Sequence, residues 1–338
     1  MKKTSHYHFP SELRFDPVSK DWILIATGRA RKPETFAKDP PAGRQEKEIP
    51  PIKTCPFCHL ETEKTILEYK NKKGEWFVKV IPNKFPAFSV NMGLNKRKEG
   101  PYKVMDGVGF AEVVVTRDHT RSMAQFSVQE IRQVLDVYQE RYLDLMNEKF
   151  VDYVSIFHNH GYEAGASIYH PHSQIITHPV IDPDLRRSLN GSARYYRLHK
   201  KCVHCAMLDF DRKDARRIVF ENRDFIVLCP FASKIAFEIR IYPKSHHAYF
   251  ERIEDDEKEF LAEAFKVAFS KLSKALNDPP YNFFLHTAPC DGRNYDHYHW
   301  HFEILPKTST WAGFELGTGI EISTIEPETA AKYLRKQT

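Results

Sequence analysis

The feature that most constrains this fold is an internal repeat, in which one set of motifs occurs twice in the same order. Each half begins with a Cys-x-x-Cys pair, followed by a strand-like run that ends near a lone histidine, His119 or His246. A helix-like segment and another strand come next, and a Tyr-His-x-His-x-x-Ile motif closes each half, at 169–175 and 298–304. The lone histidine precedes the first histidine of that motif by 51 residues in one half and 53 in the other. Two copies of one supersecondary unit explain this order.

We expect the two units to form two domains, residues 1–188 and 189–338. A chain of 338 residues with 41% apolar residues, 24 Phe and 16 Tyr can bury a substantial core. Its net charge of +5 is too weak to require a nucleic-acid partner, although it suits phosphate-bearing substrates. The apolar stretches are too short to span a membrane, and the first 16 residues lack the apolar run of a signal peptide. We therefore expect a soluble, cytoplasmic protein with neither a membrane nor a nucleic-acid partner.

Periodicity and capping signals predict a mixture of helices and strands. Helices are expected over 127–147, opened by a capping box of Ser127 and Glu130, and over 255–276, where acidic residues suit the helix dipole. Loops are expected over 29–53 and 91–103. Strands are expected at 76–81, 111–116, 153–157, 173–177, 225–228, 236–242, 281–286 and 301–305.

Each half also offers two thiols and two imidazoles that match a metal site. In a chain without an export signal, Cys-x-x-Cys favours metal over a disulfide. Zinc takes four nitrogen or sulfur ligands in a tetrahedron, so each set would close a structural site without an open position. The first set is Cys55, Cys58, His119 and His170. The second is Cys202, Cys205, His246 and His299, with His247, His286, His297 and His301 as competing ligands and another divalent metal still open.

The segment Tyr-His-Pro-His-Ser-Gln at 169–174 carries the strongest catalytic signal. On a strand, His170 and His172 point to the same face, so a metal-held His170 would place His172 at a fixed distance. A neutral imidazole can attack phosphorus and form a phosphoramidate if its other ring nitrogen keeps its proton on an acceptor. Gln174 lies on the same face and can hold a phosphoryl oxygen.

Ser167 and the glycine-containing loop 161–165 can supply further donors near the phosphates. The alternative is that His172 is a packed strand histidine or another metal ligand, and the motifs around it favour catalysis. His301 is the equivalent position in the second half. It lacks the Ser-Gln pair, so we expect it to have a structural or substrate-side role.

Several segments together resemble the galactose-1-phosphate uridylyltransferase family, a branch of the histidine-triad superfamily. They are CPFC (55–58), PNKFPA (82–87), RDHTR (117–121), FHNHGYEAGASIYHPHSQI (157–175), PKSH (243–246), NDPPYNFFLHTAP (277–289), HWHFEILP (299–306) and GFELGTG (313–319). The resemblance implies an α+β fold with a duplicated histidine-triad-like unit, whose two open antiparallel half-barrel sheets carry helices packed outside. It covers nearly the whole chain.

The resemblance also implies roles for individual residues. A nucleoside monophosphate would pass through a covalent bond to His172 in a ping-pong reaction, with Gln174 steadying the phosphoryl group. Asn159 and Ser167 match positions that touch the nucleotide phosphates. The remaining matches are Asn83 and Phe85 in the nucleoside pocket, Arg29 in a segment that reaches the partner subunit of a homodimer, and Phe314 and Glu315 in the hexose-phosphate loop.

The sequence departs from the best-known bacterial members of the family in two places. One departure bears on the metal of the second site, and the other on the sugar-phosphate acceptor. Residues 178–188 contain no Glu for the iron site of those members, and the second Cys/His set resembles the second zinc site of others, including a plant adenylyl-transferring phosphorylase. In the hexose-phosphate loop, Ser309 and Phe314 stand where those members carry Lys and Tyr, whereas Glu315 is retained.

We therefore expect a UDP-glucose–hexose-1-phosphate uridylyltransferase of galactose metabolism with two zinc ions per chain. It would convert UDP-glucose and galactose 1-phosphate to glucose 1-phosphate and UDP-galactose. The alternative enzyme is an ADP-glucose or dinucleoside-polyphosphate phosphorylase, which needs the same His172 and Gln174. The alternative of another class is a non-catalytic, zinc-stabilised nucleotide-binding protein, which the intact His172 and Gln174 disfavour.

Overall fold

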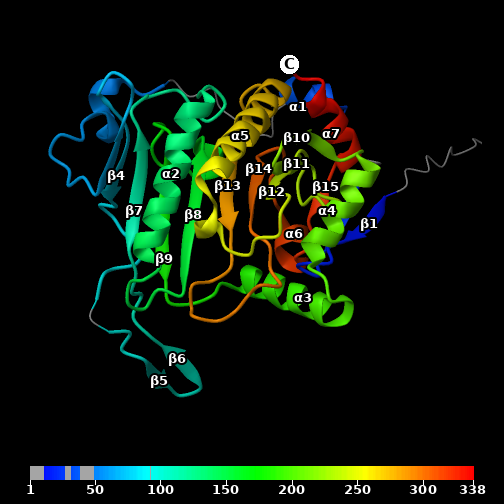
Figure 1. The fold of residues 1–338 in the computed structure, drawn as a ribbon, viewed down its shortest axis with the longest axis horizontal. Helices are drawn as coiled ribbons and strands as arrows, with labels where there is room; N and C mark the ends of the chain where they lie inside the picture. The colour runs from blue at the N-terminus through cyan, green and yellow to red at the C-terminus, as the bar shows by residue number, and fades with distance from the viewer. Residues whose placement is uncertain (1–10, 27–31, 39–48, 92) are drawn as a thin grey trace, which may run out of the picture.

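The computed structural model describes residues 11–26, 32–38, 49–91 and 93–338, and its main feature is a large antiparallel sheet (Figure 1). The strands are β1 Glu12–Phe15, β2 Trp22–Ile25, β3 Leu67–Lys70, β4 Trp76–Pro82, β5 Arg97–Glu99, β6 Tyr102–Val104, β7 Ala111–Thr116, β8 Tyr153–His160, β9 His172–His178, β10 Ile218–Glu221, β11 Phe225–Leu228, β12 Ile239–Pro243, β13 Tyr281–His286, β14 His301–Pro306 and β15 Ile322–Ser323. The α-helices are α1 Pro33–Lys38, α2 Val128–Leu145, α3 Pro183–His199, α4 Val203–Asp214, α5 Asp255–Leu276, α6 Gly313–Thr318 and α7 Pro327–Arg335.

The order of strands in the large sheet confirms the duplication. Its ten strands run β10-β11-β12-β14-β13-β8-β9-β7-β4-β3, so each half supplies five strands in the same arrangement. The two half-sheets join where β8 pairs with β13, from Tyr281 opposite His160 to Phe284 opposite Phe157. The expected α+β class is therefore confirmed, and the two half-sheets form one continuous open sheet.

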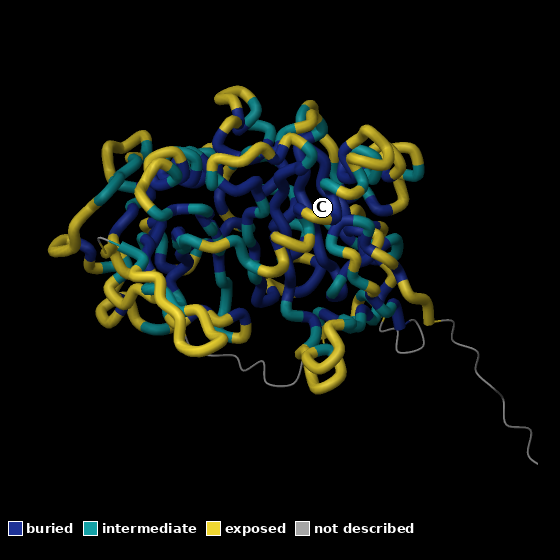
Figure 2. Tube along the Cα trace, turned by 90° about the horizontal axis from the view of Figure 1, so that it is seen from below, coloured by how far each residue is buried: buried dark blue, intermediate teal, exposed yellow. Residues whose placement is uncertain are grey.

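One face of this sheet is covered by α2 and α5, which lie side by side (Figure 1). Ser127 and Glu130 form the expected capping box of α2, and α5 spans the expected residues 255–276. The apolar stripes of both helices pack on the strands in a single core, where the rings of Phe265 and Phe302 lie 4.8 Å apart. Figure 2 shows this buried interior, with exposed residues along the outer loops. The opposite face of the sheet is left for the functional residues.

The two outer strands of the large sheet, β3 and β10, share two features. Each is four residues long, and each shows a register shift against its neighbour. Side chains from helices bond to backbone oxygens at both ends of the sheet. Gln133 of α2 donates to the Lys70 carbonyl at 2.9 Å, and Arg335 of α7 donates to the carbonyls of Arg216 and Ile218.

The structure corrects three local predictions. The strand expected at 236–242 begins only at Ile239, because Phe237 has a positive φ of 65° and the Glu238 N–H closes a turn on the Ile235 carbonyl. The expected loop 29–53 contains α1, whose Phe36 packs edge-on against Phe237. The expected loop 91–103 contains the strands β5 and β6, which form a projecting hairpin (Figure 1). Short elements like these carry too few periodic residues for a clear signal.

The helix α3 includes the predicted domain boundary at 188 and 189 and packs very closely on the N-terminal segment. A Cβ added to Gly191 would lie 1.9 Å from the Val18 carbonyl oxygen. Within the described part of the chain, no helix has the length and apolar character needed to cross a bilayer.

We expect Gly191→Ala to destabilise the protein, although alanine is favoured over glycine inside helices by about 1 kcal/mol. The overlap with the Val18 backbone must push α3 outward, at a net cost of roughly 1–3 kcal/mol. Urea unfolding measures the difference. Gly317→Ala in α6 is the matched control, because a Cβ there meets no atom within 4 Å. Equal stability of the two variants would contradict the close packing.

Candidate functional site

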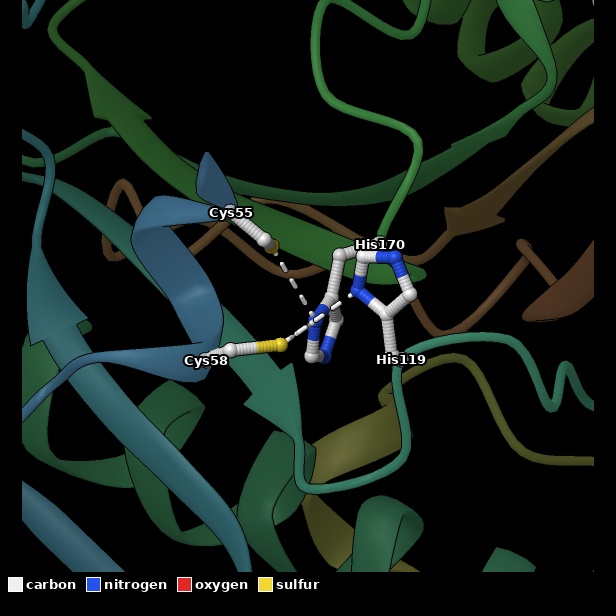
Figure 3. A group of neighbouring side chains, drawn as sticks. All are labelled: Cys55, Cys58, His119 and His170. Carbon is white, nitrogen blue, oxygen red and sulfur yellow. Dashed lines mark hydrogen bonds between the residues drawn. The ribbon is translucent and has the colours of Figure 1, made fainter. Parts of the chain in front are cut away.

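The four residues of the first predicted ligand set come together, and Figure 3 shows their side chains turned toward one another. Cys55 packs with Val113 and Val115, whereas Val114 packs with α2, so the set lies on the face of the sheet away from α2. Cys55 precedes a short 3-10 turn, Pro56–Cys58, and Cys58 ends it. His119 follows β7, and His170 lies two residues before β9 begins. The Cys58 sulfur lies 3.3 Å from Nδ1 of His119 and 3.4 Å from Nδ1 of His170. The Cys55 sulfur lies 3.5 Å from the same nitrogen of His170. Tetrahedral zinc with these ligand types gives sulfur–nitrogen separations of about 3.6 Å.

The tautomers of the two histidines show what the cluster requires. Nε2 of His170 lies 2.6 Å from the Thr116 carbonyl oxygen, and Nε2 of His119 lies 2.8 Å from that of Pro50. A carbonyl only accepts, so each Nε2 carries the proton and each Nδ1 turns a lone pair toward the sulfurs. Burial and the neighbouring Cys55 thiol raise the pKa of Cys58 to about 12. Two imidazole lone pairs and two thiols that face one another in this way can coordinate a metal cation.

The second predicted ligand set repeats this design in the other half. Cys202 and Cys205 lie at the start of α4, and the four ligand atoms lie within 4.8 Å of one another. The Cys205 sulfur is 3.3 Å from Nδ1 of His246 and 3.5 Å from Nδ1 of His299. Their Nε2 atoms donate to the carbonyls of Asp296, at 2.7 Å, and Pro243, at 3.0 Å. Both sets could therefore hold a metal ion.

His172 is the first residue of β9 and is only 7% exposed. Its Nδ1–H donates to the His170 carbonyl at 2.9 Å, which leaves the lone pair on Nε2. Its ring meets that of Phe57 at 4.9 Å, so the cysteine-bearing turn covers one side of it. Burial lowers the pKa of His172, and the hydrogen bond to His170 opposes this only in part. The imidazole is therefore neutral near pH 7, as a nitrogen nucleophile must be.

The strand β9 is held from its other face. Ser173 points toward α2, where its hydroxyl lies 2.5 Å from the Tyr138 hydroxyl and 3.0 Å from Nδ1 of His158. Alternation along the strand then puts His172 and Gln174 on the open face together. Phe157 of β8 lies directly opposite Gln174 in the ladder.

Asn159, two residues after Phe157, lies on the same open face. Its Oδ1 accepts a hydrogen bond of 2.7 Å from Asn282 of β13. The following loop turns at Gly161 and Gly165, with φ of 80° and 88°, and leads to Ser167, which is exposed. The structure thus brings His172, Gln174 and Asn159 together on the open face of β8 and β9.

The other predicted substrate residues lie further out. Asn83 follows β4, two strands from β9, and lines a cavity of about 700 Å³ with Pro86, Phe88 and Ala111. Phe85 is 84% exposed. Phe314 is 49% exposed, and the Glu315 carboxylate accepts the Ala312 N–H at the start of α6. Within the described ranges, no hydrogen bond or ring contact joins Phe314 or Glu315 to His172. Arg29 lies outside the described residues.

The sequence reasoning missed a buried polar cluster on the open face of the second half. His286, His301 and Glu303 form a third group that could hold a metal, but Glu303 already lies 3.2 Å from Arg240. His286 and His301 therefore belong to this group and not to the second Cys/His set. A cavity of about 560 Å³ runs from Asn159 across Asn282 to this cluster. The charged residues Glu238 and Arg240 in the otherwise apolar run 235–242 were the signal in the sequence.

His301 repeats the local geometry of His172. Its Nδ1–H donates to the His299 carbonyl at 3.2 Å, and Glu303 stands two residues later, where Gln174 follows His172. An ionised carboxylate there has no N–H to donate to a phosphoryl oxygen, unlike the Gln174 amide. That His301 is not a nucleophile stays a prediction.

Comparisons with known proteins agree with this arrangement. A family model described as galactose-1-phosphate uridyl transferase, N-terminal domain, matches residues 2–182, and a domain of unknown function matches residues 104–337. ADP-glucose phosphorylase from Arabidopsis thaliana is 31% identical over 96% of this chain and 92% of its own length. Galactose-1-phosphate uridylyltransferase from Thermotoga maritima is 28% identical over 96% of this chain and 98% of its own.

Solved structures give the same two kinds of neighbour. The Arabidopsis thaliana ADP-glucose phosphorylase with bound ADP-glucose has a TM-score of 0.81 at 29% identity, covering 97% of this chain and 100% of that one. A uridylyltransferase has a TM-score of 0.74 at 30% identity, covering 96% and 97%.

Proposed function

The chain belongs to the galactose-1-phosphate uridylyltransferase family, and from this membership we propose that it moves a nucleoside monophosphate from a nucleotide sugar to an acceptor through a covalent bond to His172. The observation that carries the proposal is the state of His172. Its Nδ1 proton is held by the His170 carbonyl, and within the described part of the chain no hydrogen bond engages its Nε2 lone pair.

The reaction divides into two displacements at the same phosphorus. Nε2 of His172 bonds to the α-phosphorus of the donor while the bond to the bridging oxygen breaks, and the sugar 1-phosphate leaves with that electron pair. An oxygen of the acceptor then attacks the same phosphorus, and the nitrogen–phosphorus electron pair returns to Nε2. The proton stays on Nδ1, hydrogen-bonded to the His170 carbonyl, throughout both displacements, so the imidazole transfers no proton.

Three further residues would act on the phosphates. The amide groups of Gln174 and Asn159 would donate to non-bridging oxygens, whose charge spreads in the transition state. Ser167 would add a hydroxyl from the loop beyond Gly165. Asn83 and Phe85 would hold the nucleoside, since the exposed Phe85 ring offers a surface for stacking a base.

We propose zinc in both Cys/His sets, two ions per chain. When bound, zinc would supply a fixed tetrahedral anchor and no redox chemistry. Cys55, Cys58, His119 and His170 would hold the first ion, and His170 would in turn keep its carbonyl aligned with His172. The second ion, on Cys202, Cys205, His246 and His299, would brace the other half.

For the donor and acceptor we put UDP-glucose and a hexose 1-phosphate first, a reaction of galactose metabolism. The family model and the Thermotoga maritima relative support this choice. Phosphorolysis of ADP-glucose is the second candidate, supported by the Arabidopsis thaliana relative and by the match to its complex with ADP-glucose. A homodimer would complete the site, with Arg29 reaching the site of the partner subunit and with Phe314 and Glu315 in the hexose-phosphate loop.

The decisive experiment is a loading and discharge assay. Protein is incubated with UDP-glucose or ADP-glucose labelled in the nucleotide, and the label that stays on the protein is measured. The loaded protein is then offered galactose 1-phosphate, glucose 1-phosphate or inorganic phosphate. We expect loading from UDP-glucose, and slow or permissive discharge by sugar phosphates, because Ser309 and Phe314 replace a cation and a phenol.

Each outcome points to one function. Loading from ADP-glucose with discharge by phosphate would move the protein to the phosphorylase candidate. Fast discharge by galactose 1-phosphate alone would mean that other side chains replace the missing contacts, since one charge-assisted contact is worth about 1.5–3 kcal/mol. No covalent label from any nucleotide would leave only a nucleotide-binding role.

A further inference from the structure

Asn282 lies on β13, the strand of the second half that pairs with β8 of the first half. Its side-chain nitrogen donates two hydrogen bonds. Its Nδ2 donates to Oδ1 of Asn159 at 2.7 Å and to the Ala164 carbonyl at 2.7 Å. Asn282 belongs to the second half by sequence, whereas Asn159 and Ala164 belong to the half that carries His172. The second half therefore reaches directly into the candidate phosphate site.

The two bonds fix the orientation of both amide groups. The Ala164 carbonyl can only accept, so the Asn282 atom facing it must be the NH₂ group. The second hydrogen of that NH₂ then points to Asn159, which must present its oxygen in return. Asn159 thus has its Oδ1 occupied, and rotating its amide by 180° would set two NH₂ groups against each other.

This orientation leaves the Asn159 NH₂ group available. Nδ2 of Asn159 lies on the side of Gly165, 4.0 Å from where a Cβ of that glycine would be. Asn159 and Asn282 both line the cavity of about 560 Å³ on the open face, so a ligand can reach them. Among the described residues, no hydrogen bond engages this NH₂ group. A donor held in place before the substrate arrives needs no reorganisation during the reaction.

We propose that Asn282 is a positioning residue for nucleotidyl transfer, which acts by keeping the Asn159 NH₂ group turned toward the phosphoryl oxygen. The inference rests on the proposed function and adds a residue of the second half to its machinery. Asn282 itself touches Asn159 and the loop at Ala164, and its effect on the phosphate passes through Asn159.

The sharpest variant is Asn282→Asp, which keeps the shape and replaces the NH₂ group with an oxygen. The new carboxylate faces two acceptors, so the Asn159 amide should rotate, donate to that carboxylate, and turn its own oxygen toward the phosphate. Donors of this kind are typically worth 10²–10³ in rate, so we expect His172 loading to slow about a hundredfold. Asn282→Ala only frees the amide to rotate and should slow loading about tenfold.

A double-mutant cycle separates positioning from general damage. Single-turnover loading of His172 is measured for wild type, Asn282→Asp, Asn159→Ala and the double variant, with folding checked by circular dichroism. Since Asn282 acts through Asn159, the double variant should load about as slowly as Asn159→Ala alone. Asn222→Asp is the matched control, because Asn222 also donates to two acceptors, the Phe260 carbonyl and Glu263, away from this site. It should load at the wild-type rate.

Three results would overturn the inference. The first is a loading rate of Asn282→Asp within threefold of wild type. If the aspartate variant does not fold, the loading rate of Asn282→Ala is compared with wild type instead. The second is a fully additive cycle, which would mean that Asn282 acts by another route. The third is wild-type protein that takes up no label from either nucleotide sugar. That result would refute the proposed function itself. It can be distinguished from the first two results because the wild-type protein, and not only a variant, fails to load.

Discussion

Replacing His172 with asparagine is expected to abolish nucleotidyl transfer, with loading at least a thousandfold below wild type. The imidazole forms the covalent bond, and removing a nucleophile typically costs roughly 10³–10⁶ in rate. An asparagine amide can still donate to the His170 carbonyl, as Nδ1–H does at 2.9 Å, so metal content and folding should stay near normal. Retained label after acid and alkali treatment measures the loss, since a phosphoramidate is acid-labile and alkali-stable.

His301→Asn is the matched control for this experiment. His301 has the same backbone hydrogen bond, the same place on its strand and similar burial, but it is followed by Glu303. We expect this variant to load label on His172 at close to the wild-type rate. Peptide mapping that found the nucleotide on His301 or His286 would contradict the assignment.

Removing the first metal should unfold much of the half that carries His172. Cys55 is buried beside His170, and its turn covers Val113 and Val115 of β7, so a metal bound there would tie this segment to the sheet. Metal binding at such sites is coupled to folding and can supply roughly 10 kcal/mol. We expect Cys55→Ser to lower the melting temperature by roughly 10 °C or more. The zinc content measured by elemental analysis should fall from two ions per chain to about one.

Cys290→Ser controls for the loss of a thiol as such, because Cys290 is half-buried and lies outside both sets. It should keep the full metal content and nearly the wild-type melting temperature. Cys202→Ser should lose the other ion while keeping part of the His172 chemistry. Folded wild-type protein with a metal content near zero would refute both sites.

Much of this site could be predicted because duplication makes sequence signals support one another. Cys55, Cys58, His119 and His170 are far apart in the chain, but the same order recurs at Cys202, Cys205, His246 and His299, and the structure gathers each set. The roles of His172 and Gln174 followed from alternation on one strand, and β9 does put both on the open face. These roles themselves remain predictions until the variants are measured.

Other features depend on pairing between distant strands, which no local pattern contains. The junction of β8 with β13 turns the two half-sheets into one and brings Asn282 to Asn159. Buried charges are equally hard to foresee, because Arg240 is paired both with Glu238, two residues away, and with Glu303 on another strand. The short helix α1 and the hairpin of β5 and β6 were missed because a few residues show no period.

The two outer strands, β3 and β10, have a consequence for how this protein behaves at high concentration. An open sheet has two free margins, and a flat, unpaired margin is a template on which another chain can add and fibres can grow. Here both margins are short and irregular in register, and Gln133 and Arg335 already occupy carbonyls along them. The duplication that built a ten-stranded sheet thus also gave each of its two margins features that disfavour end-on polymerisation.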